Sequence, residues 1–289
     1  EANFAHLNTS SPQWQVKYVK GWSFKMGPSP SFVGASHIIH AQTLQNREEP
    51  FVTPKVIRKP LEINVNGLMT PGRRLFPASL PEQLLKPFKI SKIRAVLSGK
   101  PDPARNIKLE ETENISSQWL AFAAQSQPIL INENSELSVL FDLEDYYCGY
   151  PILSLSGGEG SEATVSWSES LKKIKQSSNN KPFSEKGNRN QIIDKSFDGI
   201  SDIYFPDGTT DQIFRPCWWR AGRYVMLSIR TAQAPLTLNS LTGLECRYPV
   251  EYEGFFKSSD TEINQTIPML VRGLHARTHQ TNIEAPCSE

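Results

Sequence analysis

Apolar residues occupy every second position in two segments of the chain, 137–143 and 163–167. A period of two residues is typical of a half-buried strand, because successive side chains of a strand point to opposite faces. Shorter apolar runs also occur, separated by turn residues such as Gly157–Gly160 and Asp207-Gly208. These runs cover residues 152–155, 224–229 and 235–244. Short strands at this spacing predict a mainly β fold, either a β-sandwich or a jelly roll.

The N-terminal part of the chain has a weaker pattern. Leu61, Ile63 and Val65 alternate with polar residues and lead into Asn66-Gly67, which predicts a β-hairpin. Six prolines between residues 70 and 105 argue against a helix interior or a central strand, because proline has no backbone N–H to donate. We therefore predict a connector that lies over the surface of a domain, with a short helical turn at 81–85.

The pattern changes again near residue 256. Ser258-Ser259-Asp260 offers a helix N-cap, and Glu262 places a negative charge in the first turn. Apolar residues then recur at a spacing of about 3.6 residues, and Pro268 is expected to kink or restart this helix. They are Ile263, Ile267, Leu270, Val271 and Leu274. No second helix of comparable length is predicted to cover this stripe, so we expect the chain to stop where a helical domain begins.

The predicted organisation has three parts. Residues 1–105 form a β-rich segment with the proline-rich connector, and residues 106–255 form the β-sandwich. Residues 256–289 begin the helical domain, and residues 260–289 are predicted to be the least stable segment, since their apolar stripe lacks partners.

Composition narrows the classes of partner. The 289 residues carry 31 Lys and Arg against 30 Asp and Glu, a net charge of +1, so no bulk field attracts nucleic acid or an anionic membrane. No segment approaches the roughly 20 apolar residues of a membrane helix, and we expect no membrane insertion. The four cysteines lack the CxxC spacing of a metal or redox site and are interpreted as incidental buried thiols. No residue pattern demands a metal or another cofactor.

Several patterns that would assign a chemistry are missing from the sequence. It contains neither a GxxxxGK[ST] phosphate-binding loop nor a GxSxG nucleophile elbow. His275 and His279 lie four positions apart, a spacing that can hold zinc, but no HExxH motif is present. We therefore interpret them as a surface or interdomain pair.

Aromatic residues give a more suggestive pattern. Tyr147, Trp218 and Trp219 lie close to predicted strands, and a flat ring can stack on the apolar face of a sugar. Core packing is the alternative, and we expect at least one of the two tryptophans to be buried. We also expect Arg220 and Arg223 to form structural ion pairs with acidic side chains.

Several blocks of the sequence resemble, in order, the bacterial α-L-rhamnosidases of glycoside hydrolase family 78. The most specific block, residues 214–224, is similar to the FxPxWWR…RY run of Bacteroides-like members. The end of the chain, Glu284-Ala285-Pro286-Cys287-Ser288-Glu289, is similar to the DCPxxE run that opens the catalytic domain of that family. The other blocks cover residues 141–144, 149–151, 165–171, 186–189, 202–208, 248–249 and 256–260.

The resemblance implies a β-sandwich followed by an (α/α)6 barrel, of which this chain holds only the entry helix. It also implies an inverting hydrolase that acts on rhamnose-containing glycans and is exported to the periplasm or secreted. By motif position Glu289 matches the general acid, whereas Glu284 replaces a substrate-binding Asp. The catalytic base lies beyond this chain, so we expect the 289 residues alone to be inactive, with the missing barrel as their natural packing partner. A non-catalytic carbohydrate-binding module and a purely structural sandwich are the alternatives.

Overall fold

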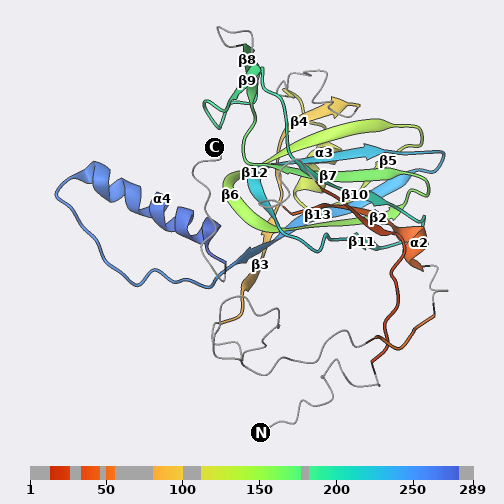
Figure 1. Ribbon diagram of the computed structural model, residues 1–289. Coiled ribbons are helices and arrows are strands. Elements are labelled where there is room, and N and C mark those ends of the chain that lie inside the picture. The colour runs from red at the N-terminus through yellow and green to blue at the C-terminus, as the bar shows by residue number, and fades with distance from the viewer. Residues whose placement is uncertain are drawn as a thin grey trace.

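The computed structural model describes residues 14–26, 34–45, 50–55, 81–99, 112–176 and 182–279. In this part the protein is mainly β, with one large mixed sheet and a C-terminal helix (Figure 1), which confirms the predicted fold class. The strands are β1 (Trp22–Lys25), β2 (Ser36–His40), β3 (Leu84–Lys89), β4 (Lys92–Ser98), β5 (Ile129–Ile131), β6 (Glu136–Gly157), β7 (Glu162–Ser168), β8 (Lys173–Gln176), β9 (Pro182–Glu185), β10 (Ile200–Phe205), β11 (Gln212–Phe214), β12 (Arg220–Arg230) and β13 (Leu236–Arg247). The helices are α2 (Ala41–Gln45), α3 (Ser117–Ala123) and α4 (Thr261–Arg277).

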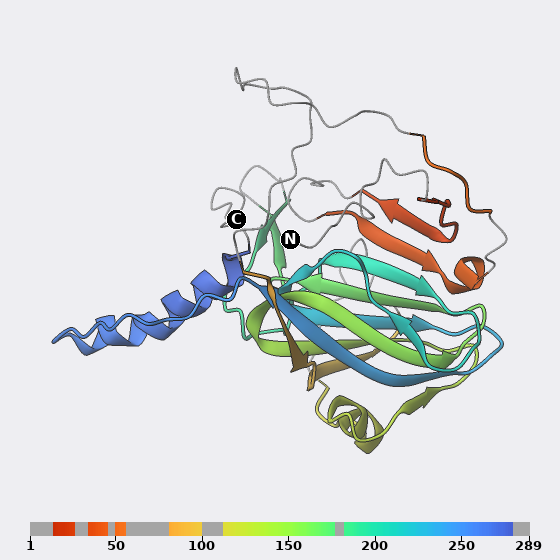
Figure 2. The same ribbon diagram turned by 90° about the horizontal axis from the view of Figure 1, so that it is seen from below.

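The long strand β6 organises the sheet. The main strand order is β1-β2-β10-β7-β12-β6-β13-β3, and β4 and β11 pair with β6 while β5 pairs with β13. The first half of β6 lies between β12 and β4, and its second half pairs with β13 and β11. Because the neighbours change along one strand, the sheet curls around the core that it buries (Figure 2).

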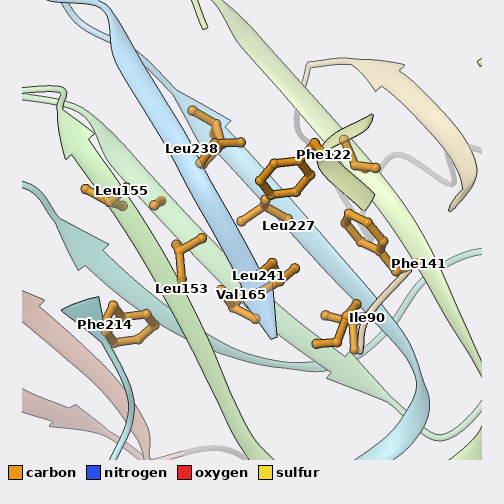
Figure 3. Packing of buried hydrophobic residues seen from close by; sticks show 14 of the residues in the cluster. Ile90, Phe122, Phe141, Leu153, Leu155, Val165, Phe214, Leu227, Leu238 and Leu241 are labelled. Carbon is orange, nitrogen blue, oxygen red and sulfur yellow. The ribbon is translucent and has the colours of Figure 1, made fainter. Parts of the chain in front are cut away.

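The main core lies on the inner face of this sheet (Figure 3). Val139 and Phe141 of β6 point into it, as the alternation predicts. The opposite face of β6 is also buried, since Leu140 belongs to a second, smaller cluster. Its other members are Ala95, Leu171, Ile192, Phe197, Tyr224 and Met226. β6 is therefore buried on both faces, whereas a half-buried strand was predicted.

The prediction for the proline-rich segment is wrong in part. Residues 84–98 form strands β3 and β4 rather than a connector, and no helical turn occurs at 81–85. Pro87 is tolerated because β3 is the last strand of the sheet order, where a missing N–H costs no ladder bond on the open side. Ile93 and Ala95 are buried and fix β4 against the body of the sheet. The predicted hairpin at 61–67 lies outside the described residues.

Strands from both sides of residue 105 share the one sheet. β2 pairs in parallel with β10, β3 pairs with β13, and β4 pairs with β6. The division into parts 1–105, 106–255 and 256–289 stays a prediction. Strands β8 and β9 pair only with each other and form a separate two-stranded ribbon.

The predicted C-terminal helix is confirmed as α4. Asp260 caps it and accepts a hydrogen bond from the Glu262 backbone N–H at 2.9 Å. The helix runs through Pro268 without a break. None of its residues is buried, and Figure 1 shows the helix projecting away from the sheet. Among the described residues, no helix combines the length and apolar character that crossing a membrane requires.

Candidate functional site

Three stacked rings join the segment before β12 to the end of α4. Trp218 and Trp219 lie with ring centroids 6.1 Å apart and planes 19° apart. Trp219 in turn stacks on His279, the second residue after α4, at 4.4 Å and 20°. Trp218 is 46% exposed, Trp219 is half-buried and His279 is buried. The three rings therefore run from solvent into the molecule. At least one of the two tryptophans was predicted to be buried, whereas Trp219 is only half-buried.

The backbone at Gly34 packs closely against the indole ring of Trp218. A Cβ atom at Gly34 would lie 2.8 Å from two atoms of the indole ring, so a side chain there would displace it. Gly34 also has φ +68, in the left-handed region that favours glycine. With almost half of its surface open, Trp218 is the candidate platform for the apolar face of a pyranose ring.

Tyr147 is placed differently from the two tryptophans. Its ring stacks on Phe88 at 4.4 Å, and the guanidinium carbon of Arg272 lies 4.5 Å from its centroid. Two partners therefore cover the ring, and Tyr147 links β6 to α4. Because its ring is covered, Tyr147 is a weaker candidate for sugar binding than Trp218.

His275 and His279 diverge despite their spacing. His275 Nε2 lies 3.1 Å from the Val250 carbonyl oxygen. Neither ring nitrogen of His279 has a hydrogen-bond partner among the described residues, and burial lowers the pKa of this imidazole. The part of the chain that the structure describes holds no group of three or more His, Cys, Asp or Glu arranged to bind a metal ion.

Arg220 forms a buried ion pair, as predicted. Its Nε lies 2.7 Å from Asp202 Oδ2 and its Nη2 lies 2.5 Å from Asp202 Oδ1, a bidentate geometry. Asp202 Oδ1 also accepts a hydrogen bond from the His37 backbone N–H at 2.8 Å. Three strands, β2, β10 and β12, thus meet at one carboxylate, and Arg220 directly follows Trp219 in the chain.

Arg223 is also paired with an acidic residue, as predicted. Its Nε lies 2.7 Å from Asp142 Oδ1 and its Nη2 lies 2.9 Å from Asp142 Oδ2. Arg94 of β4 donates to the same carboxylate at 2.8 Å. Burial alone would raise the pKa of Asp142, but the hydrogen bonds from Arg223, the Glu144 backbone and Arg94 outweigh it and lower the pKa.

We expect stability to fall in mild acid. The pKa of Asp202 is also lowered, because hydrogen bonds from Arg220 and His37 outweigh burial, which raises it. A carboxyl whose pKa is lower in the folded state stabilises the fold above its unfolded pKa of about 3.9, and this contribution is lost as the pH falls. The free energy of unfolding should be level near neutral pH and decrease below about pH 5. Urea titrations between pH 7 and pH 3 would check this, and an unchanged midpoint would contradict it.

Arg272 anchors α4 to the sheet. Its Nη1 donates to Glu245 Oε1 at 2.9 Å, its Nε lies 2.7 Å from Asp145 Oδ2, and it also donates to the Tyr146 carbonyl oxygen. Glu245 is buried in β13. The anchor lies on α4 seven positions before His279, the residue that stacks on Trp219.

Arg272→Met should release this helix. The change keeps an apolar stem over Tyr147 but leaves the buried Glu245 with Arg247, whose Nε lies 3.5 Å from Glu245 Oε1. We expect a loss of about 2 kcal/mol in the free energy of unfolding. Amide hydrogen exchange in α4 should become faster. Gln265→Met, at an exposed position of the same helix, is the control and should change neither quantity. Equal exchange rates in both variants would show that Arg272 does not anchor α4.

Glu284 and Glu289 lie outside the described residues. The structure therefore does not place the predicted general acid or the predicted substrate-binding carboxylate. Sequence reasoning missed the contact of His279 with Trp219, for which a separation of 60 positions gives no signal.

Comparisons with known proteins give structural likenesses only. No family model and no curated protein matches the chain. A GH78 family rhamnosidase of Bacillus sp. GL1 is 18% identical, over 55% of this chain and 15% of that chain, with a TM-score of 0.39. A rhamnosidase from Klebsiella oxytoca with rhamnose bound is 11% identical, over 69% of this chain and 36% of that chain, with a TM-score of 0.41.

A third likeness is to a smaller protein, a CBM32 of AlyQ in complex with 4,5-unsaturated mannuronic acid. It is 11% identical, over 53% of this chain and 95% of that chain, with a TM-score of 0.23.

This chain spans well under half the length of either rhamnosidase. Likenesses at these TM-scores do not assign a function.

Proposed function

We propose that this chain is the N-terminal β-sandwich portion of an inverting glycoside hydrolase of the α-L-rhamnosidase type, acting on rhamnose-containing glycans. The observation that carries the proposal is the ordered series of motif blocks that ends in Glu284–Glu289. The most specific block, residues 214–224, contributes Trp219, which stacks on His279 ten residues before Glu289. The sandwich would thus hold the segment that leads into the proposed catalytic residues.

The proposed chemistry needs two carboxyl groups. Glu289 would protonate the leaving oxygen, while a second carboxylate, further along a longer protein, would activate water on the opposite face of the sugar. The 289 residues alone would then be inactive. The exposed apolar residues of α4, among them Met269 and Leu270, would pack on the catalytic barrel. Export to the periplasm or the medium is part of the proposal and rests on the resemblance alone.

The test of the substrate class is a panel of p-nitrophenyl glycosides, offered to the longer gene product. We expect release of p-nitrophenol from the α-L-rhamnoside and at most traces from the β-glucoside, β-galactoside and α-L-fucoside. Hydrolysis of another sugar in the panel, with the rhamnoside untouched, would keep a glycosidase but remove the rhamnosidase assignment.

A carbohydrate-binding module is the second candidate, and the exposed ring of Trp218 favours it. Trp218→Ala should then raise the Kd of the 289-residue chain for a rhamnose-containing oligosaccharide roughly tenfold, about 1.4 kcal/mol, because the stacking platform is lost. Calorimetric titration would measure it. Tyr252→Ala, at another exposed aromatic position, is the control and should leave the Kd unchanged. Equal affinity of the wild type and Trp218→Ala would exclude Trp218 as the platform.

A further inference from the structure

Three of the four cysteines converge at one end of the sheet, although 69 and 29 positions separate them in the sequence. Cys148 lies on β6, Cys246 lies on β13, and Cys217 lies in the segment before β12. All three are free thiols, the first two buried and the third exposed. The Cys246 thiol donates to Gln83 Oε1 at 3.2 Å. Burial raises the pKa of Tyr150, and the nearby Cys246 and Cys217 add to the rise.

Cys148 and Cys246 lie directly beside the last paired residues of β6 and β13. β6 and β13 are antiparallel neighbours (Figure 1). Leu244 lies opposite Tyr150, and Glu245 lies opposite Gly149. The paired residues end there, and continuation of the same register by one step would bring Cys246 opposite Cys148. Directly opposed residues of an antiparallel pair project to the same face, with Cα atoms about 4.5–5.5 Å apart. A disulfide requires about 4.4–6.8 Å.

We propose that Cys148 and Cys246 are a modification site, at which a cross-strand disulfide forms when the chain folds in the presence of a small-molecule disulfide. Two thiols are oxidised, one S–S bond forms between the strands, and the S–S bond of one glutathione disulfide breaks to give two glutathione thiols. The inference is independent of the proposed enzymatic function.

The surroundings of the thiols set when the bond can form. Burial raises the pKa of Cys148 to about 12, and nearby Cys246 and Glu245 add to the rise while Arg272 opposes it. A thiolate is the attacking species in thiol–disulfide exchange, so the buried pair reacts slowly once the reduced chain has folded. Oxidation should therefore occur during refolding rather than in the native protein.

The disulfide would also affect α4. The Cys148 thiol donates to the Ala276 carbonyl oxygen at 2.8 Å, in the last turn of that helix. Bond formation removes this donor, so we expect faster amide exchange at the end of α4. The bond would also close a loop of about 100 residues, and constraint of the unfolded chain should raise the Tm by roughly 5–10 °C.

The experiment is refolding of the full 289-residue chain in a glutathione redox buffer, followed by alkylation and peptide mapping without reduction. We expect a linked peptide pair containing Cys148 and Cys246 in the wild type and in the matched control Cys217→Ser. The pair should be absent from Cys148→Ser and from Cys246→Ser, and dithiothreitol should abolish the gain in Tm.

Two results would overturn the proposal. One is a wild-type chain with a native circular dichroism spectrum in which Cys148 and Cys246 are both alkylated after unfolding. The other is a link from either residue to Cys217 or Cys287 in place of the predicted pair. Both readouts come from the wild type and Cys217→Ser, so they stand even if a serine variant fails to fold. A chain without glycosidase activity would leave either result unchanged.

Discussion

Asp202→Ala is expected to lower the free energy of unfolding by about 3–5 kcal/mol, because it leaves a buried cation without its counterion. The Arg220 side chain is only 2% exposed, and Asp202 supplies both oxygens of its bidentate ion pair. The His37 backbone N–H would lose its acceptor as well. Urea denaturation at pH 7 would measure the effect as a shift of the midpoint at unchanged slope.

Asp198→Ala is the matched control. Asp198 pairs with Lys172 at 3.2 Å, but its side chain is 64% exposed, so we expect a change within about 0.5 kcal/mol. The double variant Asp202→Leu with Arg220→Met should recover part of the loss, because it removes both buried charges together. A loss below 1 kcal/mol for Asp202→Ala would show that the ion pair does not hold β2, β10 and β12 together.

Glu289→Gln is expected to reduce the kcat of the longer protein for rhamnosides by about 10²–10⁴-fold, the usual contribution of a general acid. The amide keeps the size of the side chain but cannot donate the proton that the leaving oxygen requires. The loss should be greater for an alkyl rhamnoside than for p-nitrophenyl α-L-rhamnoside, since p-nitrophenolate leaves without full protonation. Steady-state kinetics on the two substrates would measure this difference.

The control is Glu253→Gln, at an exposed position before α4, and should leave kcat unchanged. The midpoint of thermal unfolding should be the same for both variants and the wild type. Near-wild-type rates of Glu289→Gln on both substrates would remove Glu289 from the proposed role. An equal loss on both substrates would contradict proton donation.

The sequence pattern predicted the strands in which apolar residues alternate toward the main core. The alternation around Val139 and Val165 led to β6 and β7, and the cap at Asp260 led to α4. β3 and β4 were missed because the six prolines between residues 70 and 105 argued against a central strand, whereas a terminal strand of a sheet, such as β3 with Pro87, tolerates proline. The second core was missed because Ile192 and Phe197 lie in a polar segment without a period.

The site was only partly predictable for a similar reason. The types of Arg220 and Arg223 indicated that they would seek acidic partners, but nothing local selected Asp202 and Asp142 from the other carboxylates. The stack of Trp219 on His279 and the opposition of Cys148 and Cys246 arise from strand register and helix docking. Such contacts depend on the tertiary fold, and spacing along the chain does not encode them.

The most direct test of the proposed function is the rate of p-nitrophenol release from p-nitrophenyl α-L-rhamnoside, measured side by side for the longer gene product and the 289-residue chain. We predict turnover by the longer protein and none by the 289 residues, because the proposed catalytic base lies outside the 289 residues. Turnover by the 289-residue chain would contradict the proposed division of the active site. Turnover by neither would contradict the hydrolase assignment. Glu284→Asp would then be the first substitution to test, because the motif has aspartate at this position.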